Sequence, residues 1–320
     1  MSPLLFPLNP AILLAFGIGG VLIVASATGV ALRWSVARNA PHPVIDNLIT
    51  RINAWWGTAA VFGTALLFDR TGLVALFAVA SFVALREYAT VAPTHRADHR
   101  AWLMGFWVVL PAQYYLVWAG RYGAFTTLVP LYAFLALPIV AALSGRHETR
   151  GYLPRIAAAQ WGLVLCVFAV SHVPALLTLH VPNYEGRNAY LVVWLLLVVE
   201  GNDVLQYIWG KVAGVRPLAP HLSPSKTLEG CIGGIASATV LGAALWRVTP
   251  FSPLEAALIS LVLAAMGTLG GLVLSAIKRD RGIKDWGTCI PGHGGMLDRL
   301  DSVCFAAPVF FHIVRWGWSL

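Results

Sequence analysis

A chain of 320 residues in which 58% are hydrophobic and only 11% are charged has too few charges to cover a water-soluble globule. Its mean hydropathy of +0.73 is typical of a protein solvated mainly by lipid. The net charge of +8 does not indicate a nucleic-acid partner, because the charges lie in short loops between apolar stretches rather than on one basic domain.

Ten apolar stretches are candidates for spanning helices, since a bilayer provides no water for backbone N–H and C=O groups. They lie at about 11–32, 52–68, 71–85, 101–119, 122–143, 157–179, 189–209, 230–246, 254–277 and 302–318. Only Asp69 and Arg70 separate the second stretch from the third, so these two could instead form one broken hairpin. We therefore predict an all-α, polytopic integral membrane protein with about nine to ten spanning helices, in a single domain over residues 1–320.

Basic residues alternate between successive loops. The odd-numbered loops hold 17 of the 22 Lys and Arg residues, and the even-numbered loops with the C-terminal end hold the other 5. By the positive-inside rule, the odd-numbered loops face the cytoplasm and both termini lie outside. The seventh loop (residues 210–229) and the ninth loop (residues 278–301) are the richest in Gly, Pro and paired charges. We expect a polar active-site cavity there, at the cytoplasmic face of the cell membrane.

The ninth loop combines acids, bases and a glycine-rich turn. Asp285, Asp298 and Asp301 offer the hard oxygen ligands that Mg²⁺ prefers, and Asp298 and Asp301 are spaced to share one face of a helix. The turn at 291–295 lets backbone N–H groups approach an anion closely. The basic residues suited to phosphate are Lys278, Arg279 and Lys284. A merely solvated loop explains Asp280 and Arg281, but three acids beside apolar helix ends are rare without a function.

The seventh loop and the helix before it add polar groups on the same side. Glu200 and Asp203 share one helix face, and acids at membrane depth are costly unless they face a cavity or a metal. Ser223 followed by Pro224 predicts a helix N-cap with Pro in the first turn, where a phosphate could bind. Lys226 would then lie in the first turn of that helix.

The string from Ser275 to Asp301 resembles the signature of the phosphatidate cytidylyltransferase (CDP-diglyceride synthase) family, S-x-x-K-R-x4-K-D-x-G-x2-I-P-x-H-G-G-x-x-D-R-x-D, and matches it at each fixed position. Asp203 and the segment 222–230 extend the resemblance, so the catalytic part is expected at about 189–305. The chain departs from the family pattern at 206–211, at Ser225, which replaces the common Lys, and at Leu228, which replaces the common Trp. These departures leave the choice of lipid substrate open.

The resemblance implies transfer of the cytidylyl group of CTP to phosphatidic acid, which gives CDP-diacylglycerol and pyrophosphate. Together with the residue chemistry, it assigns catalytic roles to Asp285, Asp298, Lys284, Lys226 and Ser223. It assigns metal binding to Asp203, Asp285, Asp298 and Asp301, and phosphate binding to Lys278, Arg279, His293, Gly294, Gly295 and Arg299. Mg²⁺ is the expected cofactor, with a second cation such as K⁺ as an open point. CTP, phosphatidic acid and membrane lipids are the expected partners, with no nucleic acid, and the resemblance suggests a homodimer.

Three other functions compete with this one. A secondary transporter would spread its polar residues over repeat-related helices, whereas here the acids concentrate in one third of the chain. An enzyme acting on another lipid phosphate, such as a CTP-dependent polyprenol kinase or an archaeol-type cytidylyltransferase, shares much of the chemistry. An inactive paralogue with a regulatory or scaffolding role is disfavoured, because this chain retains every candidate acid. The sequence leaves open the acyl or isoprenoid preference, the second cation, the oligomeric state and whether the enzyme is a housekeeping or a specialised copy.

A few polar residues outside the two loops have simpler interpretations. We expect His172 and His312 to be packed, hydrogen-bonded histidines, and Glu87 to pair with Arg86 at a helix end. The spacing of four between Gly267 and Gly271 favours close helix packing.

Overall fold

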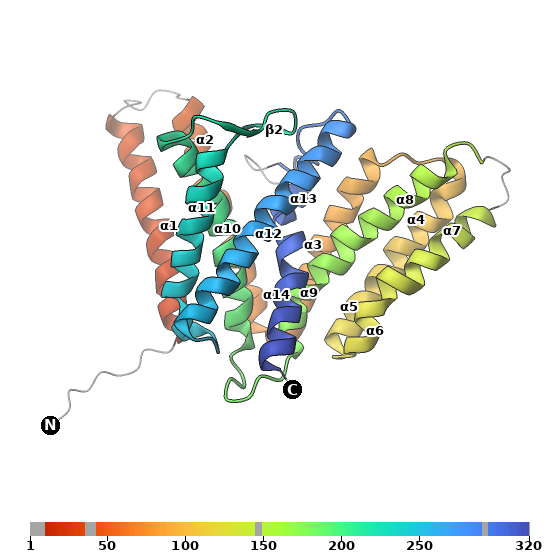
Figure 1. Cartoon of the computed structure of the whole chain (residues 1–320), viewed down its shortest axis with the longest axis horizontal. Coiled ribbons are helices and arrows are strands. Elements are labelled where there is room, and N and C mark those ends of the chain that lie inside the picture. Colours follow the sequence, from red (N-terminus) through yellow and green to blue (C-terminus); the bar gives the residue numbers. More distant parts are fainter. Residues whose placement is uncertain (1–9, 36–42, 145–148, 290–293, 320) are drawn as a thin grey trace. The chain divides into compact units, whose positions relative to one another are not determined.

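The computed structural model describes residues 10–35, 43–144, 149–289 and 294–319 (Figure 1). By its internal contacts the described part of the chain divides into two compact units, one up to Thr64 and one that comprises Ala65–Cys289 and the residues from Gly294 onward. Each unit is considered by itself below. The expectation of one transmembrane domain over residues 1–320 stays a prediction.

Helices make up most of the described residues, and each of the predicted apolar stretches is helical. The first helices are α1 (Pro10–Ser35), α2 (Pro43–Leu67) and α3 (Asp69–Val91). Each of the next three stretches is a helix with a π-helical turn in its middle: α4 (His99–Met104) to α5 (Leu110–Trp118), α6 (Tyr122–Thr127) to α7 (Phe134–Ala142), and α8 (Tyr152–Leu163) to α9 (Val170–Ala175). The remaining helices are α10 (Asn188–Val212), α11 (Leu228–Ala244), α12 (Pro253–Asp280), α13 (Leu297–Leu300) and α14 (Val303–Trp318).

The lengths and apolarity of these helices fit a membrane. In the part of the chain that the structure describes, five helical stretches are long and apolar enough to cross a bilayer. They are Asp69–Val91, Tyr122–Ala142, Tyr152–Thr178, Asn188–Val212 and Pro253–Asp280, and Leu22–Ser35, Leu228–Ala244 and Val303–Trp318 are shorter apolar helices. The prediction of an all-α, multi-pass membrane protein is therefore confirmed. The second and third predicted stretches correspond to two helices, α2 and α3. Asp69, at the boundary between them, has a positive φ of 49°.

Within the second unit, successive loops lie at opposite ends of the helices. The loop after α3, the β-hairpin before α11 and the loop after α12 share one end, whereas the turns before α6, α10 and α12 share the other (Figure 1). This arrangement agrees with the alternation of basic residues, since the third, seventh and ninth loops fall at the same end. The two candidate catalytic loops are therefore neighbours at one end of the bundle.

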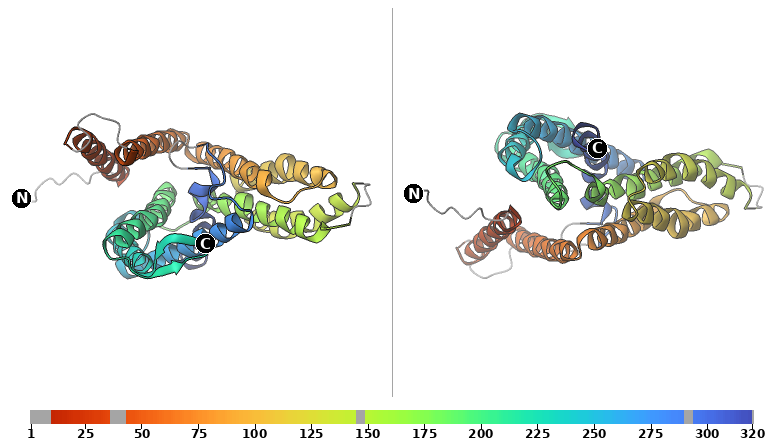
Figure 2. Two further views of the ribbon diagram at one scale, coloured as in Figure 1. Left: turned by 90° about the horizontal axis from the view of Figure 1, so that it is seen from above. Right: turned by 90° about the horizontal axis from the view of Figure 1, so that it is seen from below.

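Glycines let α10, α11 and α12 approach one another closely. A Cβ at Gly234 of α11 would lie 2.3 Å from Gln206 Cγ of α10, and a Cβ at Gly242 would lie 1.7 Å from Ser260 Oγ of α12. Between α10 and α12 the amide NH2 groups of Asn202 and Gln206 donate to Thr268 Oγ1, at 3.1 and 2.8 Å, and tie the two helices together. Figure 2 shows α10, α11 and α12 as one cluster from both ends of the molecule.

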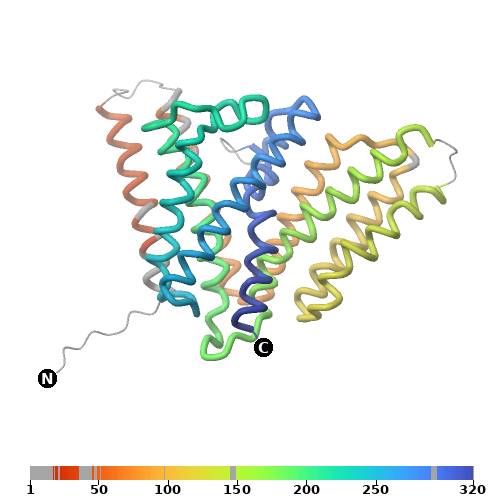
Figure 3. The backbone as a smooth tube through the Cα atoms, in the orientation of Figure 1, coloured from red at the N-terminus to blue at the C-terminus, as the bar shows by residue number. Residues whose placement is uncertain are grey.

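Helix α14 packs against both α12 and α9. The expected close packing at the glycines of α12 is confirmed: a Cβ at Gly267 would lie 3.4 Å from Ser302 Cβ, just before α14. His172 of α9 packs among aromatic rings, and its Nδ1 bonds to Phe168 O at 2.8 Å, as expected for a structural histidine. Figure 3 traces the backbone from α12 through α13 into α14, in the blue part of the colour range.

The helix start predicted at Ser223 is wrong. Residues Ser223–Thr227 form strand β2, which pairs antiparallel with β1 (Pro217–Ala219). A residue before Pro is restricted to extended backbone, and Pro is compatible with an edge strand, so Ser223 and Pro224 begin this strand equally well. The N-cap of α11 is instead Thr227, whose Oγ1 accepts from Gly230 N at 3.1 Å.

A glycine-to-alanine pair tests the packing of α11 on α12. We predict that Gly242→Ala lowers the free energy of unfolding by about 1–3 kcal/mol, because the new methyl group overlaps Ser260 and the helices must separate. Gly123→Ala is the control, since a Cβ there meets nothing within 4 Å. Thermal unfolding of the detergent-solubilised protein measures both, and equal unfolding temperatures for the two variants would contradict the packing.

Candidate functional site

Asp298 holds the two sides of the ninth loop together. Its Oδ2 accepts from the backbone N–H groups of Trp286 and Gly295, at 2.8 and 2.9 Å. Its Oδ1 accepts from Lys278 Nζ at 2.8 Å, in an ion pair whose side chains are 11% and 7% exposed. Gly294 has a φ of +83°, which glycine adopts readily, and a Cβ there would lie 2.9 Å from Asp298 Oδ2. Asp298 and Lys278 therefore organise the loop.

Glu87, near the end of α3, makes the next contacts along the same backbone. Its two carboxylate oxygens accept from Met296 N and Leu297 N, each at 2.9 Å. The expected pairing of Glu87 with Arg86 is therefore wrong: the side chain is 5% exposed and turned toward the ninth loop, while Arg86 is exposed. Burial and a hydrogen bond to Glu87 raise the pKa of the Cys289 thiol to about 11.

These contacts use three N–H groups at the end of the glycine-rich turn and just after it. The N–H group of Gly295 bonds to Asp298, and those of Met296 and Leu297 bond to Glu87. The phosphate-binding role expected of Gly294 and Gly295 stays a prediction. Sequence reasoning missed Glu87 because more than 200 residues separate it from the loop. The local sequence around Glu87 shows only an acid near the end of an apolar helix, which does not indicate a contact with the ninth loop.

A second group of charges lies around Gly271 of α12. Asp203 Oδ2 accepts from the Ser302 hydroxyl at 2.6 Å, and Asp301 Oδ1 lies 3.4 Å from the same hydroxyl and accepts from Ser302 N at 2.8 Å. A Cβ at Gly271 would lie 3.3 Å from Lys226 Nζ and 4.0 Å from Asp301 Oδ2. The fold thus brings together Asp203, Lys226 and Asp301 from α10, β2 and the segment before α14. We call Asp203 and Asp301 the acidic pair.

The surroundings of the acidic pair contain further charges. Arg299 lies close enough to Glu200 and Asp203 to interact with them electrostatically, and Lys278 likewise interacts with Asp301. Burial and the neighbouring Asp203 raise the pKa of Asp301 to about 6, although Lys278 and Lys226 oppose this shift. Two neighbouring half-buried carboxyl groups, one with a raised pKa, form a place where a bound cation would lower the electrostatic free energy.

Of the remaining predicted site residues, Asp285 lies nearest to Asp298: its Cβ is 3.6 Å from a Cβ built at Gly294. Lys284, Asp285 and Arg279 are exposed, and Arg279 donates to the backbone carbonyls of Leu222 and Ile283, both at 3.1 Å, so it links the seventh loop to the ninth. Ser223 lies in β2. His293 lies outside the described residues. Asp280 and Arg281 form the expected solvated pair, at 3.1 Å.

The four predicted metal ligands form two neighbouring sets: Asp285 and Asp298 lie beside Gly294, and Asp203 and Asp301 lie at the Ser302 hydroxyl. Their metal-binding role stays a prediction. Asp298 is engaged by Lys278 and the backbone, and Asp285 is exposed. Among the described residues, no group of three or more His, Cys, Asp or Glu side chains is placed to hold a metal ion. The acidic pair nevertheless fits Mg²⁺, which commonly binds to one or two carboxylates together with substrate phosphates.

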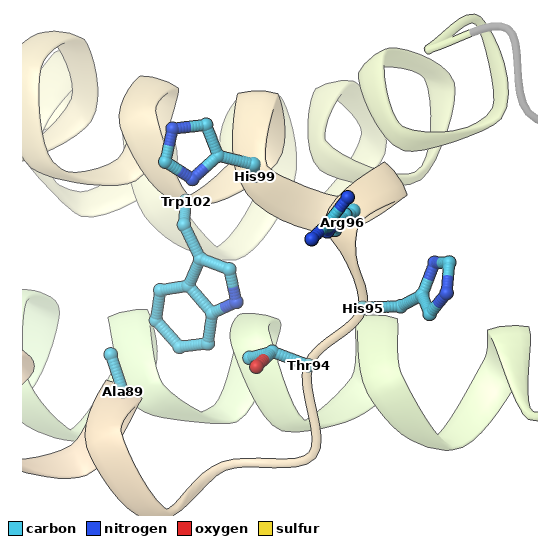
Figure 4. A pocket seen from close by; sticks show the side chains of 6 residues that line it. All are labelled: Ala89, Thr94, His95, Arg96, His99 and Trp102. Carbon is cyan, nitrogen blue, oxygen red and sulfur yellow. The ribbon is translucent and has the colours of Figure 1, made fainter.

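A separate pocket of about 580 Å³ opens beside the loop after α3. It is lined by Ala89, Thr94, His95, Arg96, His99 and Trp102 (Figure 4). None of the predicted site residues lines it, so its location does not bear on the acidic pair.

The family to which the chain belongs follows from comparison with known proteins. The model of the cytidylyltransferase family matches residues 49–316, which include α3, the acidic pair and both candidate loops. The chain belongs to this family. It is therefore a nucleotidyltransferase, and the family implies a nucleotide and a lipid as substrates.

The relatives of this cytidylyltransferase differ in how much of its chain can be aligned with them. A protein of Escherichia coli (strain K12), named uncharacterized protein YnbB, is 38% identical over 297 residues, which is 92% of this chain and 95% of the relative. A phosphatidate cytidylyltransferase of Helicobacter pylori (strain J99) is 36% identical over 217 residues, 64% of this chain and 80% of the relative. One of Bacillus subtilis (strain 168) is 38% identical over 138 residues, 42% of this chain and 51% of the relative.

A double-mutant cycle tests the buried Lys278–Asp298 pair. We predict that Asp298→Asn and Lys278→Met each destabilise the protein by about 3–5 kcal/mol, because each leaves a buried charge without its partner. The double variant should lose less than the sum of the two single variants. Thermal unfolding in detergent gives the three values.

The exposed Asp280–Arg281 pair is the matched control for this cycle. Asp280→Asn and Arg281→Met should each change stability by less than about 0.5 kcal/mol. Strict additivity of the two buried substitutions would show that Lys278 and Asp298 do not interact.

Proposed function

We propose that this cytidylyltransferase uses CTP and phosphatidic acid to form CDP-diacylglycerol and pyrophosphate at the cytoplasmic face of the membrane. The observation that carries the proposal is the acidic pair beside Lys226, at the end of the helix bundle where the two matched loops meet. Basic residues concentrated in the loops of this end support the cytoplasmic orientation. A soluble nucleotide and a lipid that diffuses within the bilayer can both reach such a place.

The reaction requires little covalent help from the protein. A phosphate oxygen of the lipid attacks the α-phosphorus of CTP, the bond from this phosphorus to the bridging oxygen breaks, and pyrophosphate leaves with that oxygen. The lipid phosphate is already ionised at neutral pH, so the attack needs no general base. The protein has to align the two phosphates and balance the negative charge that moves to the leaving group.

The described residues suggest a division of these tasks. Lys226 and Arg299 carry positive charge close to the acidic pair, and we assign them to the phosphates of the substrates. Lys278 already pairs with Asp298, so we assign this pair to positioning of the loop. The roles predicted for Lys284 and Asp285, which are exposed, stay predictions.

We assign Mg²⁺ to the acidic pair of Asp203 and Asp301. When bound there, Mg²⁺ would neutralise part of the charge of the triphosphate. A second cation such as K⁺, a role for His293 in phosphate binding, and a homodimer stay predictions.

The names of two relatives favour phosphatidic acid as the lipid. The relatives of Helicobacter pylori and Bacillus subtilis are named phosphatidate cytidylyltransferases. Of the departure at 206–211, Gln206 is buried and bonds to Thr268 between α10 and α12, whereas Tyr207, Ile208 and Trp209 are exposed, so the choice of lipid rests on the relatives.

Pyrophosphate release from the purified protein in detergent tests the function. We predict release only when CTP, phosphatidic acid and Mg²⁺ are all present, with a loss of at least about 100-fold in Asp301→Asn, because the cation loses one of two carboxylate ligands. Asp280→Asn, at an exposed position, should keep parental activity. Pyrophosphate release with polyprenyl phosphate but not with phosphatidic acid would show that the lipid substrate is an isoprenoid phosphate. No release with either lipid from folded protein would refute the proposed function.

A stability measurement tests the metal assignment without using activity. We predict that saturating Mg²⁺ raises the unfolding temperature of the parent protein by about 5 °C, since a ligand at 100 times its Kd stabilises by about 2.7 kcal/mol. Removal of Mg²⁺ with EDTA should reverse the effect, and Asp203→Asn with Asp301→Asn in one chain should abolish it. An equal rise in this double variant would place the cation elsewhere.

A further inference from the structure

Glu87 is buried where the end of α3 meets the ninth loop, and its carboxylate is fully used there. It accepts the N–H groups of two consecutive residues, Met296 and Leu297, at 2.9 Å each. Hydrogen bonds from backbone N–H groups to an ionised carboxylate are shorter and stronger than those to a neutral acceptor. The Cys289 thiol also hydrogen-bonds to Glu87, so this one side chain contacts the loop on both sides of residues 290–293.

The backbone of the loop is fitted closely around this carboxylate. A Cβ at Gly287 would lie 2.7 Å from Glu87 Oε1, and a Cβ at Gly295 would lie 2.5 Å from Glu87 Oε2. Real Cβ atoms essentially never come so close to another atom, so any larger residue at either position would move the carboxylate or the loop. The two glycines and Glu87 thus form one interlocked contact.

The neighbouring residue strengthens the same attachment. The ring of Tyr88 stacks on Trp286 with centroids 5.5 Å apart and an interplanar angle of 27°. Both rings are buried, with 4% and 3% exposure. Trp286 N in turn donates to Asp298, so α3, the loop and the Lys278–Asp298 pair are connected by direct contacts.

We propose that Glu87 is a positioning residue for cytidylyl transfer: by holding the first turn of α13 on α3, it fixes where Arg299 and Asp301 stand relative to Asp203. The proposal rests on the proposed function for its kinetic test. Glu87 touches none of the groups assigned to substrate or metal, so it acts only through the backbone that carries them. It lies outside the part expected to be catalytic, residues 189–305.

The kinetic test compares Glu87→Ala and Glu87→Gln with Arg86→Gln, an exposed neighbour on the same helix. We expect Glu87→Ala to lower kcat by about 100-fold, as a displacement of about 1 Å in an active site does, with KM for CTP within about threefold of the parent. Glu87→Gln keeps one acceptor oxygen and should lower kcat less, by about three- to tenfold relative to the parent. Arg86→Gln should match the parent.

A thiol-labelling measurement reports the contact itself and does not depend on activity. In a Cys231→Ser background the remaining cysteines are the exposed Cys289 and the buried Cys166 and Cys304. Glu87→Gln should speed maleimide labelling of Cys289 at least about threefold, because the thiol loses a charged acceptor and the loop loosens. Arg86→Gln should leave the labelling rate unchanged.

The outcomes separate this proposal from the proposed function. Parental kcat in a folded Glu87→Ala or Glu87→Gln variant overturns the positioning role, as does a lower unfolding temperature with unchanged kcat per folded molecule. If Glu87→Ala does not fold, Glu87→Gln alone decides. If the parent protein shows no cytidylyl transfer, the proposed function fails, and an unchanged labelling rate in Glu87→Gln then overturns the contact independently.

Discussion

The backbone N–H groups of the ninth loop need acceptors, because the loop leaves helical structure at the end of membrane helices and part of it is buried. Two carboxylates supply these acceptors: Asp298 binds the N–H groups of Trp286 and Gly295, and Glu87 binds those of Met296 and Leu297. Carboxylates are strong acceptors but costly to bury. The negative charge of Asp298 is balanced by Lys278, and that of Glu87 by consecutive N–H groups at the first turn of α13. The position of α13, and of the residues that follow it, depends on this arrangement.

The acids of the matched region therefore divide into two kinds. Asp298 and Glu87 each accept two backbone N–H groups of the loop and hold its backbone. Asp203 and Asp301 both lie at the Ser302 hydroxyl, next to Lys226, Asp301 also accepts the Ser302 N–H, and burial raises the pKa of Asp301. A cation at Asp298 would have to lie next to the Lys278 ammonium, which repels it, whereas the Lys226 ammonium is not in an ion pair with Asp203 or Asp301 among the described contacts. We therefore propose that Asp203 and Asp301 bind the cation for the reaction and that Asp298 positions the loop.

Much of the fold follows from the sequence, because a spanning helix is specified by local apolarity alone. The helices and the alternation of basic loops were predictable for this reason, as was the packed state of His172. The strand at Ser223 was not, since Ser followed by Pro begins a helix or an edge strand equally well and the pairing with β1 decides. The roles of Glu87 and Asp298 were also hidden. Whether a carboxylate meets an N–H group or a metal depends on residues far away in the chain.

Transfer of label from CTP labelled at the α-phosphorus into extracted lipid tests the central claim most directly. The measurement uses purified protein, phosphatidic acid and Mg²⁺, and separates the lipid product by chromatography. The account predicts that label appears in a single lipid that co-migrates with CDP-diacylglycerol, and that it disappears when Asp203 and Asp301 are both replaced by Asn. Label that never enters lipid, or that enters it equally well in the double variant, would contradict the account.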